Sequence, residues 1–182
     1  MRILHTSDWH LGQNFYSKSR AAEHEAFLNW LLETAQAHEV DAIIVAGDIF
    51  DTGSPPSYAR ELYNRFVVNL QQTGCHLVIV AGNHDSVATL NESRDILAFL
   101  NTTVVASAGH APQILKKRDG TPGAVLCPIP FLRPRDIVQS QAGLSGSEKQ
   151  QHLLQAITRY YHQQHTEACA LRGEQAIPIV AT

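Results

Sequence analysis

Short hydrophobic runs alternate with amphipathic stretches along the first 105 residues of the chain. The hydrophobic runs predict strands, and hydrophobic positions recurring every three or four residues predict helices between them. The strands are expected at residues 2–7, 42–46, 76–80 and 103–105, and the helices at residues 20–38, 57–72 and 89–100. Strands that are apolar on both faces and alternate with helices are typical of parallel βαβ units. We therefore expect an α/β fold, a layered sheet with helices on both faces.

The first two helices each present one hydrophobic face. The residues predicted to point inward are Phe27, Trp30, Leu31, Ala35, Tyr63, Phe66, Val67 and Leu70. Ser57 is the expected N-cap of the second helix because its hydroxyl can accept a bond from the first turn, and Gly74 is expected to end that helix.

The pattern changes after residue 110. Hydrophobic segments at 114–117 and 124–130, separated by a Gly- and Pro-containing turn, predict a hairpin. A polar stretch at 139–147 precedes a helix predicted over 148–164. The last segment, residues 177–182, is predicted to be a strand, and Pro178 suits the start or the edge of a strand.

Composition narrows the class of protein. With 182 residues, of which 44% are hydrophobic and 17% charged, the chain can bury one core. It has no run of about 18 apolar residues, and its start lacks the features of a signal peptide, so we expect a cytoplasmic protein without a membrane partner. The three cysteines, Cys75, Cys127 and Cys169, are far apart and predict free thiols.

The net charge of −3 and the pI of about 6.3 argue against a domain that grips nucleic acid by its overall charge. Any contact with DNA must therefore be local. The chain has ten histidines, and five scattered ones are expected to be solvated rather than to bind a metal: His24, His38, His152, His162 and His165.

Residues able to bind metals follow three of the predicted strands. They are Asp8, His10, Asp48, Asn83 and His84. In open parallel sheets, ligands bind outside the carboxyl ends of the strands, where all five residues are expected. Asp48 follows Asp8 by 40 residues and precedes Asn83 by 35, which is close to the roughly 30 residues of one βαβ unit.

Carboxylate, amide and imidazole ligands without a thiolate favour Mn²⁺, with Mg²⁺, Fe²⁺ or Zn²⁺ as alternatives. A carboxylate can bridge two ions about 3.5 to 4 Å apart, a pair that assists an in-line displacement at phosphorus. Asp48, in the central cluster, is the expected bridge. Gly47 and Gly82 each precede a candidate ligand and would permit a sharp turn there. The sequence thus predicts a phosphoesterase site with two divalent metal ions.

Three motifs carry a family resemblance: SDWHLG at residues 7–12, GDIFD at 47–51 and GNHD at 82–85. They resemble the first three signature motifs of the calcineurin-like metallophosphoesterases. Trp9, the Phe50-Asp51 pair and the run from 51 to 60 with its two prolines favour the DNA-repair nuclease branch over protein phosphatases. The likeness extends along the whole chain, although its specific motifs are short.

The resemblance implies a role for each site residue. Asp8 and His10 would hold the first metal, Asp48 would bridge, and Asn83 would bind the second. His84 would face the phosphate, stabilising the transition state or protonating the leaving oxygen. Asp51 and Asp85 would orient histidines or loops; for Asp51, capping the turn before the prolines is an equal alternative.

The resemblance also implies a biological role in DNA repair, recombination and replication. The expected activity is that of a nuclease subunit, a 3′ to 5′ exonuclease on duplex ends and an endonuclease on single strands and hairpins. A partner of the SMC ATPase type would hydrolyse ATP, since the chain has no phosphate-binding Gly-x-x-x-x-Gly-Lys motif. Family members pair as homodimers, and the helices over 57–72 and 89–100 are the candidates here.

Five basic residues could contact phosphates of DNA, with a solvated hairpin tip and surface loop as the alternative. They are Lys116, Lys117, Arg118, Arg133 and Arg135.

The chain departs from the family in one respect. The family completes its site with histidines from a Gly-His pair and a later Gly-His-x-His motif, and the one Gly-His here, Gly109-His110, is out of order. We therefore expect residues 1–182 to be the amino-terminal part of a nuclease domain, without the rest of the domain or a capping domain. Such a fragment should bind metal weakly and have little or no nuclease activity. A small-molecule phosphodiesterase or phosphatase, and a non-catalytic scaffold of the same fold, are the alternatives.

Overall fold

A parallel sheet of four strands forms the centre of the molecule in a computed structural model that describes residues 1–138, 143 and 145–182. The strands are β1 (Ile3–Thr6), β4 (Ala42–Ala46), β5 (His76–Val80) and β6 (Thr102–Val105), and they lie in the order β1-β4-β5-β6. All four predicted strands are confirmed.

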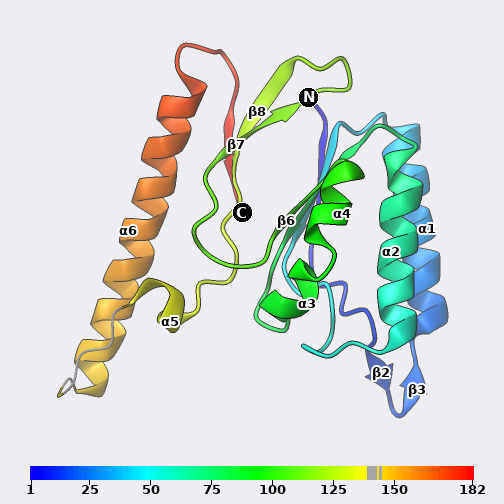
Figure 1. Ribbon diagram of the computed structural model, residues 1–182, viewed down its shortest axis with the longest axis horizontal. Coiled ribbons are helices and arrows are strands. Elements are labelled where there is room, and N and C mark those ends of the chain that lie inside the picture. Colours follow the sequence, from blue (N-terminus) through cyan, green and yellow to red (C-terminus); the bar gives the residue numbers. More distant parts are fainter. Residues whose placement is uncertain (139–142, 144) are drawn as a thin grey trace.

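Helices cover one face of this sheet (Figure 1). They are α1 (Ala21–Ala37), α2 (Ser57–Gln71), α3 (Val87–Asn91) and α4 (Arg94–Phe99). Leu31, Phe66 and Leu70 are almost fully buried, and they pack in one cluster with the side chains of Ile43 and Val45 on β4. The predicted inward faces of α1 and α2 are thus confirmed, with one exception. Trp30 is 57% exposed and lies outside this core.

Two details of the predicted helices are wrong. Ser57 is the first residue of α2 rather than its cap, because Pro56 already has the extended backbone of the N-cap position. The helix expected over 89–100 is two short helices. Glu92 and Ser93 separate them, so the hydrophobic spacing continues although the helix does not.

A second sheet covers the other face of the parallel sheet. It consists of β7 (Gln113–Lys116), β8 (Pro122–Cys127) and β9 (Ile179–Ala181), with β7 antiparallel and β9 parallel to β8. The predicted hairpin and the last strand are therefore confirmed. Ile44 and Val78 of the first sheet pack against Leu115 and Leu126 of the second. Because alternate residues of β4 and β5 serve these two cores, both strands are apolar on both sides.

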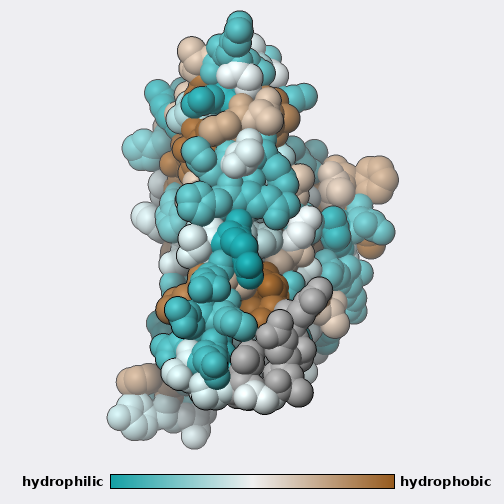
Figure 2. Space-filling view, turned by 90° about the vertical axis from the view of Figure 1, so that its left-hand side faces the viewer, coloured by the Kyte–Doolittle hydropathy of each residue, from teal (hydrophilic) through white to brown (hydrophobic). Residues whose placement is uncertain are grey.

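The long helix α6 (Gly146–Arg172) packs on the outer side of the second sheet. The molecule thus has four layers, helices, parallel sheet, mixed sheet and helix (Figure 1), which confirms the layered α/β class with helices on both outer sides. α6 begins at a capping box between Ser145 and Glu148 and continues eight residues beyond its predicted end. Most of the polar stretch predicted before it lies outside the described residues. Figure 2 looks onto the side of α6, which is mainly hydrophilic.

Two smaller elements complete the described chain. The short helix α5 (Pro134–Ile137) precedes α6, and β2 (Asn14–Phe15) and β3 (Lys18–Ser19) form an antiparallel hairpin that the sequence did not predict. In Figure 1 this hairpin projects beyond the carboxyl ends of the parallel strands. None of the described helices is both long and apolar enough to cross a membrane. All three cysteines are free thiols, as expected.

Candidate metal centre

Three candidate ligands converge at the carboxyl edge of the parallel sheet. The ligand atoms of Asp8, His10 and Asp48 all lie within 4.8 Å of one another. Nε2 of His10 is 3.8 Å from a carboxylate oxygen of Asp8 and 3.9 Å from one of Asp48. These separations allow one cation to contact all three side chains.

Backbone hydrogen bonds between the loops after β1 and β4 fix this arrangement. The amide of Asp8 donates to the carbonyl of Gly47 at 3.1 Å, and the amide of His10 donates to that of Asp48 at 2.9 Å. Leu11 continues the pairing through Ile49 at 2.9 Å. The two loops therefore extend the pairing of β1 with β4 into the site.

The three ligands share an unusual backbone conformation. The φ angles of Asp8, His10 and Asp48 are 54°, 44° and 51°, in the left-handed region, which is uncommon for residues other than glycine although Asp and His adopt it more often than most. The conformation costs an ordinary residue about 1–2 kcal/mol, and an Asp less where its side chain bonds locally. Strain concentrated on the residues that converge at one point indicates a functional constraint.

The two glycines beside the ligands act in different ways. Gly47 has a φ of 95°, so it permits the sharp turn that the sequence predicted. Gly82 is not in that region. A side chain on Gly82 would instead collide with the backbone and carboxylate of Asp48. Gly82 thus allows the loops after β4 and β5 to approach each other.

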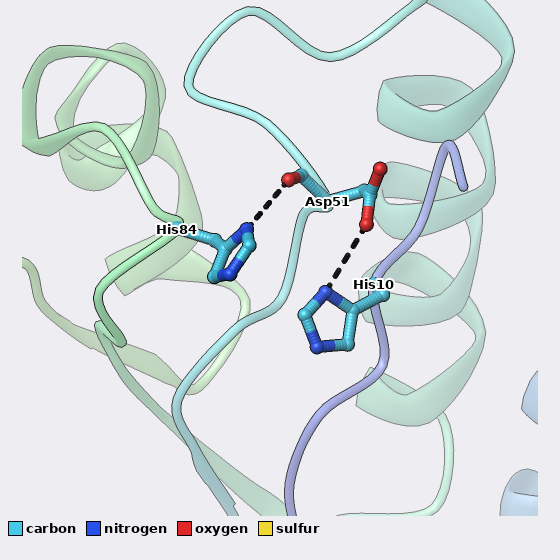
Figure 3. Close-up of side chains that lie close together, drawn as sticks. All are labelled: His10, Asp51 and His84. Atoms are coloured by element: carbon cyan, nitrogen blue, oxygen red, sulfur yellow. Dashed lines mark hydrogen bonds and ion pairs between the residues drawn. The ribbon is translucent and has the colours of Figure 1, made fainter. Parts of the chain in front are cut away.

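A second group joins His10 to Asp51 and His84 (Figure 3). A carboxylate oxygen of Asp51 lies 3.3 Å from Nδ1 of His10, at ion-pair distance but without the geometry of a hydrogen bond. The backbone carbonyl of Asp51 accepts a 2.8 Å hydrogen bond from Nδ1 of His84. Asp51 thus contacts both imidazoles, one through its side chain and the other through its backbone.

His84 is exposed, and its ring stands edge-on to that of His10 with centroids 5.0 Å apart. Its amide donates to Asp48 at 3.0 Å. With Nδ1 engaged by the carbonyl of Asp51, the proton-carrying position left for a substrate is Nε2. That carbonyl, helped by the nearby carboxylates of Asp48, Asp51 and Asp85, raises the pKa of His84. A protonated imidazole at this position is suited to an anionic substrate.

Asp85 is buried and holds loops together rather than a histidine. Its carboxylate accepts bonds from the amides of Gly82, Phe50 and Ile49 at 2.8, 3.0 and 3.2 Å. Burial raises the pKa of Asp85, although the three amides oppose the shift. The guanidinium of Arg133 donates to the backbone carbonyl of Asp85 at 2.7 Å.

Asn83 lies next to His84 in the same loop and is exposed. The structure therefore brings every residue predicted for the metal site to one edge of the sheet: Asp8, His10, Asp48, Asp51, Asn83, His84 and Asp85.

The sequence analysis missed two residues of the site, Gln13, which contacts Asp51, and Arg20, which contacts Gln13. Nε2 of Gln13 donates to the Asp51 carboxylate at 3.4 Å, and the guanidinium of Arg20 donates to Gln13 at 2.8 Å. Both residues line a hollow of about 390 Å³ that also borders Asp8 and His10. No motif pointed to them, because an isolated Gln or Arg in a loop carries no specific signal.

His24 also lines this hollow, and the expectation that it is solvated was wrong. Its side chain is buried, and burial, helped by Arg20, lowers its pKa. A signal was present in the sequence, since His24 precedes Leu28, Leu31 and Ala35 on the buried face of α1 at helical spacing.

The basic residues predicted to contact DNA fall into two groups. Arg118 binds the backbone carbonyl of Val40 at 3.1 and 3.2 Å, at the amino end of β4. The five residues of β4, at about 3.3 Å each, separate it from the metal edge. Lys116 and Lys117 lie in the same hairpin, so these three residues do not line the site. Arg133 lies at the metal edge, beside Asp85, and the exposed Arg135 follows it in α5.

The donors fit a divalent metal ion. Carboxylates and imidazole suit Mn²⁺, Mg²⁺, Fe²⁺ or Zn²⁺, and Asp48 lies between the group formed with Asp8 and the loop that carries Asn83 and His84. A parallel sheet whose strand ends present this set of carboxylates and histidines defines a metal-dependent phosphoesterase.

Comparison with known families agrees with this class. Residues 1–154 match the model of the calcineurin-like phosphoesterases, and the chain belongs to this family.

Three curated relatives share one description, the SbcD subunit of the nuclease SbcCD. The protein of Escherichia coli K12 is 85% identical over all 182 residues, which are 46% of its own length. That of Rhodobacter capsulatus is 37% identical over 148 residues, 75% of this chain and 36% of the relative. That of Bacillus subtilis is 42% identical over 87 residues, 47% of this chain and 22% of the relative. The chain thus spans about half, or less, of the length of these relatives.

Proposed function

We propose that this chain is part of the nuclease subunit of a DNA repair and recombination complex, and that the whole subunit hydrolyses phosphodiesters with two divalent metal ions. The observation that carries the proposal is the convergence of Asp8, His10 and Asp48, beside His84, at one edge of the sheet. The description shared by the relatives, a nuclease subunit, supports a nucleic acid as the substrate.

In this proposal Asp8 and His10 hold the first ion, Asp48 contacts both, and Asn83 holds the second. Mn²⁺ is the favoured metal because the ligands combine carboxylate, amide and imidazole. When bound, the metal pair supplies the activated nucleophile and neutralises charge on the phosphate.

The remaining residues of the site orient groups or move a proton. His84 donates a hydrogen bond or a proton from Nε2 to the phosphate or to the leaving oxygen, since its Nδ1 is held by Asp51. Asp51 orients the His10 ring through Nδ1. Asp85 keeps the loops after β4 and β5 at the correct spacing through its three amide bonds.

The activity proposed for the whole protein is 3′ to 5′ exonuclease action on duplex ends and endonuclease action on single strands and hairpins. An SbcC-like ATPase of the SMC type is the proposed partner and would supply the dependence on ATP. The name of the relatives, which makes each of them one subunit of SbcCD, supports a multisubunit complex. DNA repair, recombination and replication in the cytoplasm are the proposed setting.

The further ligands of the second ion are proposed to come from sequence that the relatives have and this chain does not span. Asp8, His10, Asp48 and Asn83 are four ligands for two ions, fewer than a two-metal site needs. In this proposal residues 1–182 are the amino-terminal part of the nuclease domain. Alone, they would bind metal weakly and cleave DNA little or not at all.

Pairing of two copies through α2 and α4 is proposed as well. Ile96 and Phe99 on α4 are 66% and 89% exposed, and Val68 on α2 is 49% exposed. Removing these hydrophobic side chains from water would stabilise a dimer.

The test compares substrates in the full-length protein assembled with its ATPase partner. With Mn²⁺ we expect cleavage of linear duplex and hairpin DNA, at rates well above those on bis(p-nitrophenyl) phosphate. Preference for the small diester would support a small-molecule phosphodiesterase instead. If the Asp48→Ala variant keeps every biological function of the complex, the protein is a non-catalytic scaffold.

A further inference from the structure

The hairpin of β2 and β3 carries two exposed aromatic rings at its tip. Phe15 is 66% exposed and Tyr16 is 87% exposed. Their rings touch edge to face, with centroids 4.6 Å apart. These two side chains are too exposed to stabilise the core, and adjacent exposed aromatic rings indicate a role in binding.

The turn at the tip of the hairpin lacks the residues that such turns usually contain. Tyr16 and Ser17 are the two central residues, with φ angles of 46° and 60°. Two-residue turns of this kind favour Asn-Gly or Asp-Gly, because those residues tolerate positive φ. A tyrosine here makes the turn less favourable while it places a large ring at the outermost point of the hairpin.

The base of the hairpin is part of the metal site. The amide of Gln13 donates to the carbonyl of His10 at 3.0 Å, and that of Arg20 donates to the carbonyl of Gln13 at 3.3 Å. Gln13 also contacts Asp51. Tyr16 is three residues beyond Gln13, so the tip lies about 10 Å from this base at about 3.3 Å per residue. That distance spans two to three nucleotides of a strand whose phosphate lies at the metals.

We propose that the hairpin of residues 14–19 holds the DNA strand next to the scissile phosphate, with Phe15 and Tyr16 stacking on an unpaired or terminal base. The inference rests on the proposed nuclease function and adds to it a contact that selects frayed ends and single strands over intact duplex. Stacking on aromatic rings tolerates any base, as a nuclease without sequence preference requires.

The charge of the hairpin and the small area of its tip favour a nucleic acid over a protein as its binding partner. Lys18 is exposed and lies directly opposite Phe15 in the hairpin, where it can contact a phosphate of the same strand. Two rings on a hairpin of residues 14–19 offer much less area than the roughly 800 Å² per partner of a stable protein interface.

The experiment uses the full-length protein with its ATPase partner and a Phe15→Thr, Tyr16→Asn double variant. Threonine keeps the strand preference, and asparagine favours the positive φ of the turn, so the hairpin should still form. The control is Tyr161→Gln, which removes an exposed ring from α6. Two substrates are compared, duplex DNA with a three-nucleotide single-stranded end and bis(p-nitrophenyl) phosphate.

We expect the double variant to raise the KM for the DNA about five- to tenfold, with the small diester cleaved as before, because one stacked base is lost. In the unsubstituted protein, 5-iodouracil placed in the single-stranded end should crosslink under ultraviolet light to the peptide containing residues 14–19. The Tyr161→Gln control should change neither result.

Three outcomes would overturn the inference. If the unsubstituted protein cleaves DNA and the double variant does so with the same KM, the hairpin does not bind the strand, while the proposed function stands. If the variant keeps its behaviour on DNA but no longer assembles with the ATPase, the rings dock a protein. If the unsubstituted protein cleaves the small diester but no DNA, the proposed function and this inference both fail.

Discussion

An aspartate lies at each end of β4, and the two carboxylates have opposite electrostatic surroundings. Asp41, at the amino end, accepts hydrogen bonds from the amides of Arg2 at 2.6 Å and Arg118 at 3.0 Å. The guanidinium of Arg2 also binds the carbonyl of His38, and that of Arg118 binds Val40, beside Asp41. Cations and amides thus surround the negative charge at this end.

At the carboxyl end, Asp48 lies among other carboxylates. Among the described residues, the ion-pair contacts of Asp8, Asp48 and Asp51 all go to the single imidazole of His10. The Asp48 side chain accepts a hydrogen bond from the amide of His84. Its backbone is also held in the left-handed region.

The different surroundings of Asp41 and Asp48 distinguish an aspartate that stabilises the fold from one that serves function. The amino end follows the rules for stability, with charges paired and backbone groups bonded. The carboxyl end collects like charges on strained backbone, an arrangement that costs free energy until a cation is present. Substitutions at the two ends should therefore affect different measurements.

The largest effect is expected for Asp48→Asn in the full-length protein with its partner. The rate of DNA cleavage should fall at least about 1,000-fold, because a ligand shared by two ions supplies several kcal/mol of transition-state stabilisation. The thermal stability without metal should stay the same or rise, since a like charge is removed. Single-turnover cleavage and calorimetry measure the two quantities.

Asp95→Asn, which changes an exposed carboxylate in the first turn of α4, is the matched control and should leave cleavage unchanged. A loss of less than tenfold in the Asp48→Asn variant would mean that Asp48 does not bind the metals.

The next largest effect is expected for Asp85→Ala, and it is an effect on stability. Removing the carboxylate leaves the amides of Ile49, Phe50 and Gly82 without a partner in a buried place, which should cost roughly 3 kcal/mol. Urea denaturation of the chain, followed by circular dichroism, measures this loss. Asp51→Ala is the control at the same edge, because within the described residues the Asp51 side chain accepts from Gln13 and from no backbone amide. Equal losses in the two variants would contradict the assigned role.

A smaller loss, about 1–2 kcal/mol, is expected for Asp41→Asn at the other end of the strand. Burial acts to raise the pKa of Asp41, but the amides of Arg2 and Arg118 outweigh it and lower the pKa below its usual value. The contribution of Asp41 to stability is therefore present above about pH 4, the value for the unfolded chain, and is lost as the pH falls through the lower folded pKa.

The measurement compares the free energy of unfolding of the two proteins between pH 7 and pH 3. The difference between them should shrink at the acidic end of this range. A difference that stays constant with pH would show that the Asp41 charge contributes nothing.

The strands of the parallel sheet could be predicted from the sequence, because they are hydrophobic on both faces and end at motifs that contain glycine and metal-ligand residues. β4 and β5 have the predicted bounds. The same motifs identified the residues that meet at the carboxyl edge. The left-handed backbone of Asp8, His10 and Asp48 could not be predicted, because Asp and His adopt that conformation only in a minority of their occurrences.

Contacts between distant segments were also beyond the sequence. The hairpin of residues 14–19 has two-residue strands and Tyr-Ser in its turn, so neither alternation nor turn residues announced it. Arg118 was one candidate for a DNA contact, with a solvated hairpin tip as the alternative, but the fold brings it to the carbonyl of Val40, just after α1. Gln13 became recognisable as part of the site only when Asp51 was placed beside it.

The smallest expected effect is that of Mn²⁺ on the chain of 182 residues. With four candidate ligands for two ions we expect weak binding, and an ion at a concentration equal to its Kd stabilises by only about 0.4 kcal/mol. Thermal unfolding with 1 mM Mn²⁺ measures the shift, and paramagnetic broadening of the His10 imidazole resonances locates the ion. Asp48→Asn should abolish both signals, and Asp95→Asn should leave both in place. Broadening that persists in Asp48→Asn would place the ion elsewhere. A bound cation would offset the negative charge at the carboxyl end of β4, as Arg2 and Arg118 offset that of Asp41 at the amino end. The charge difference between the two ends should therefore narrow as the metal binds.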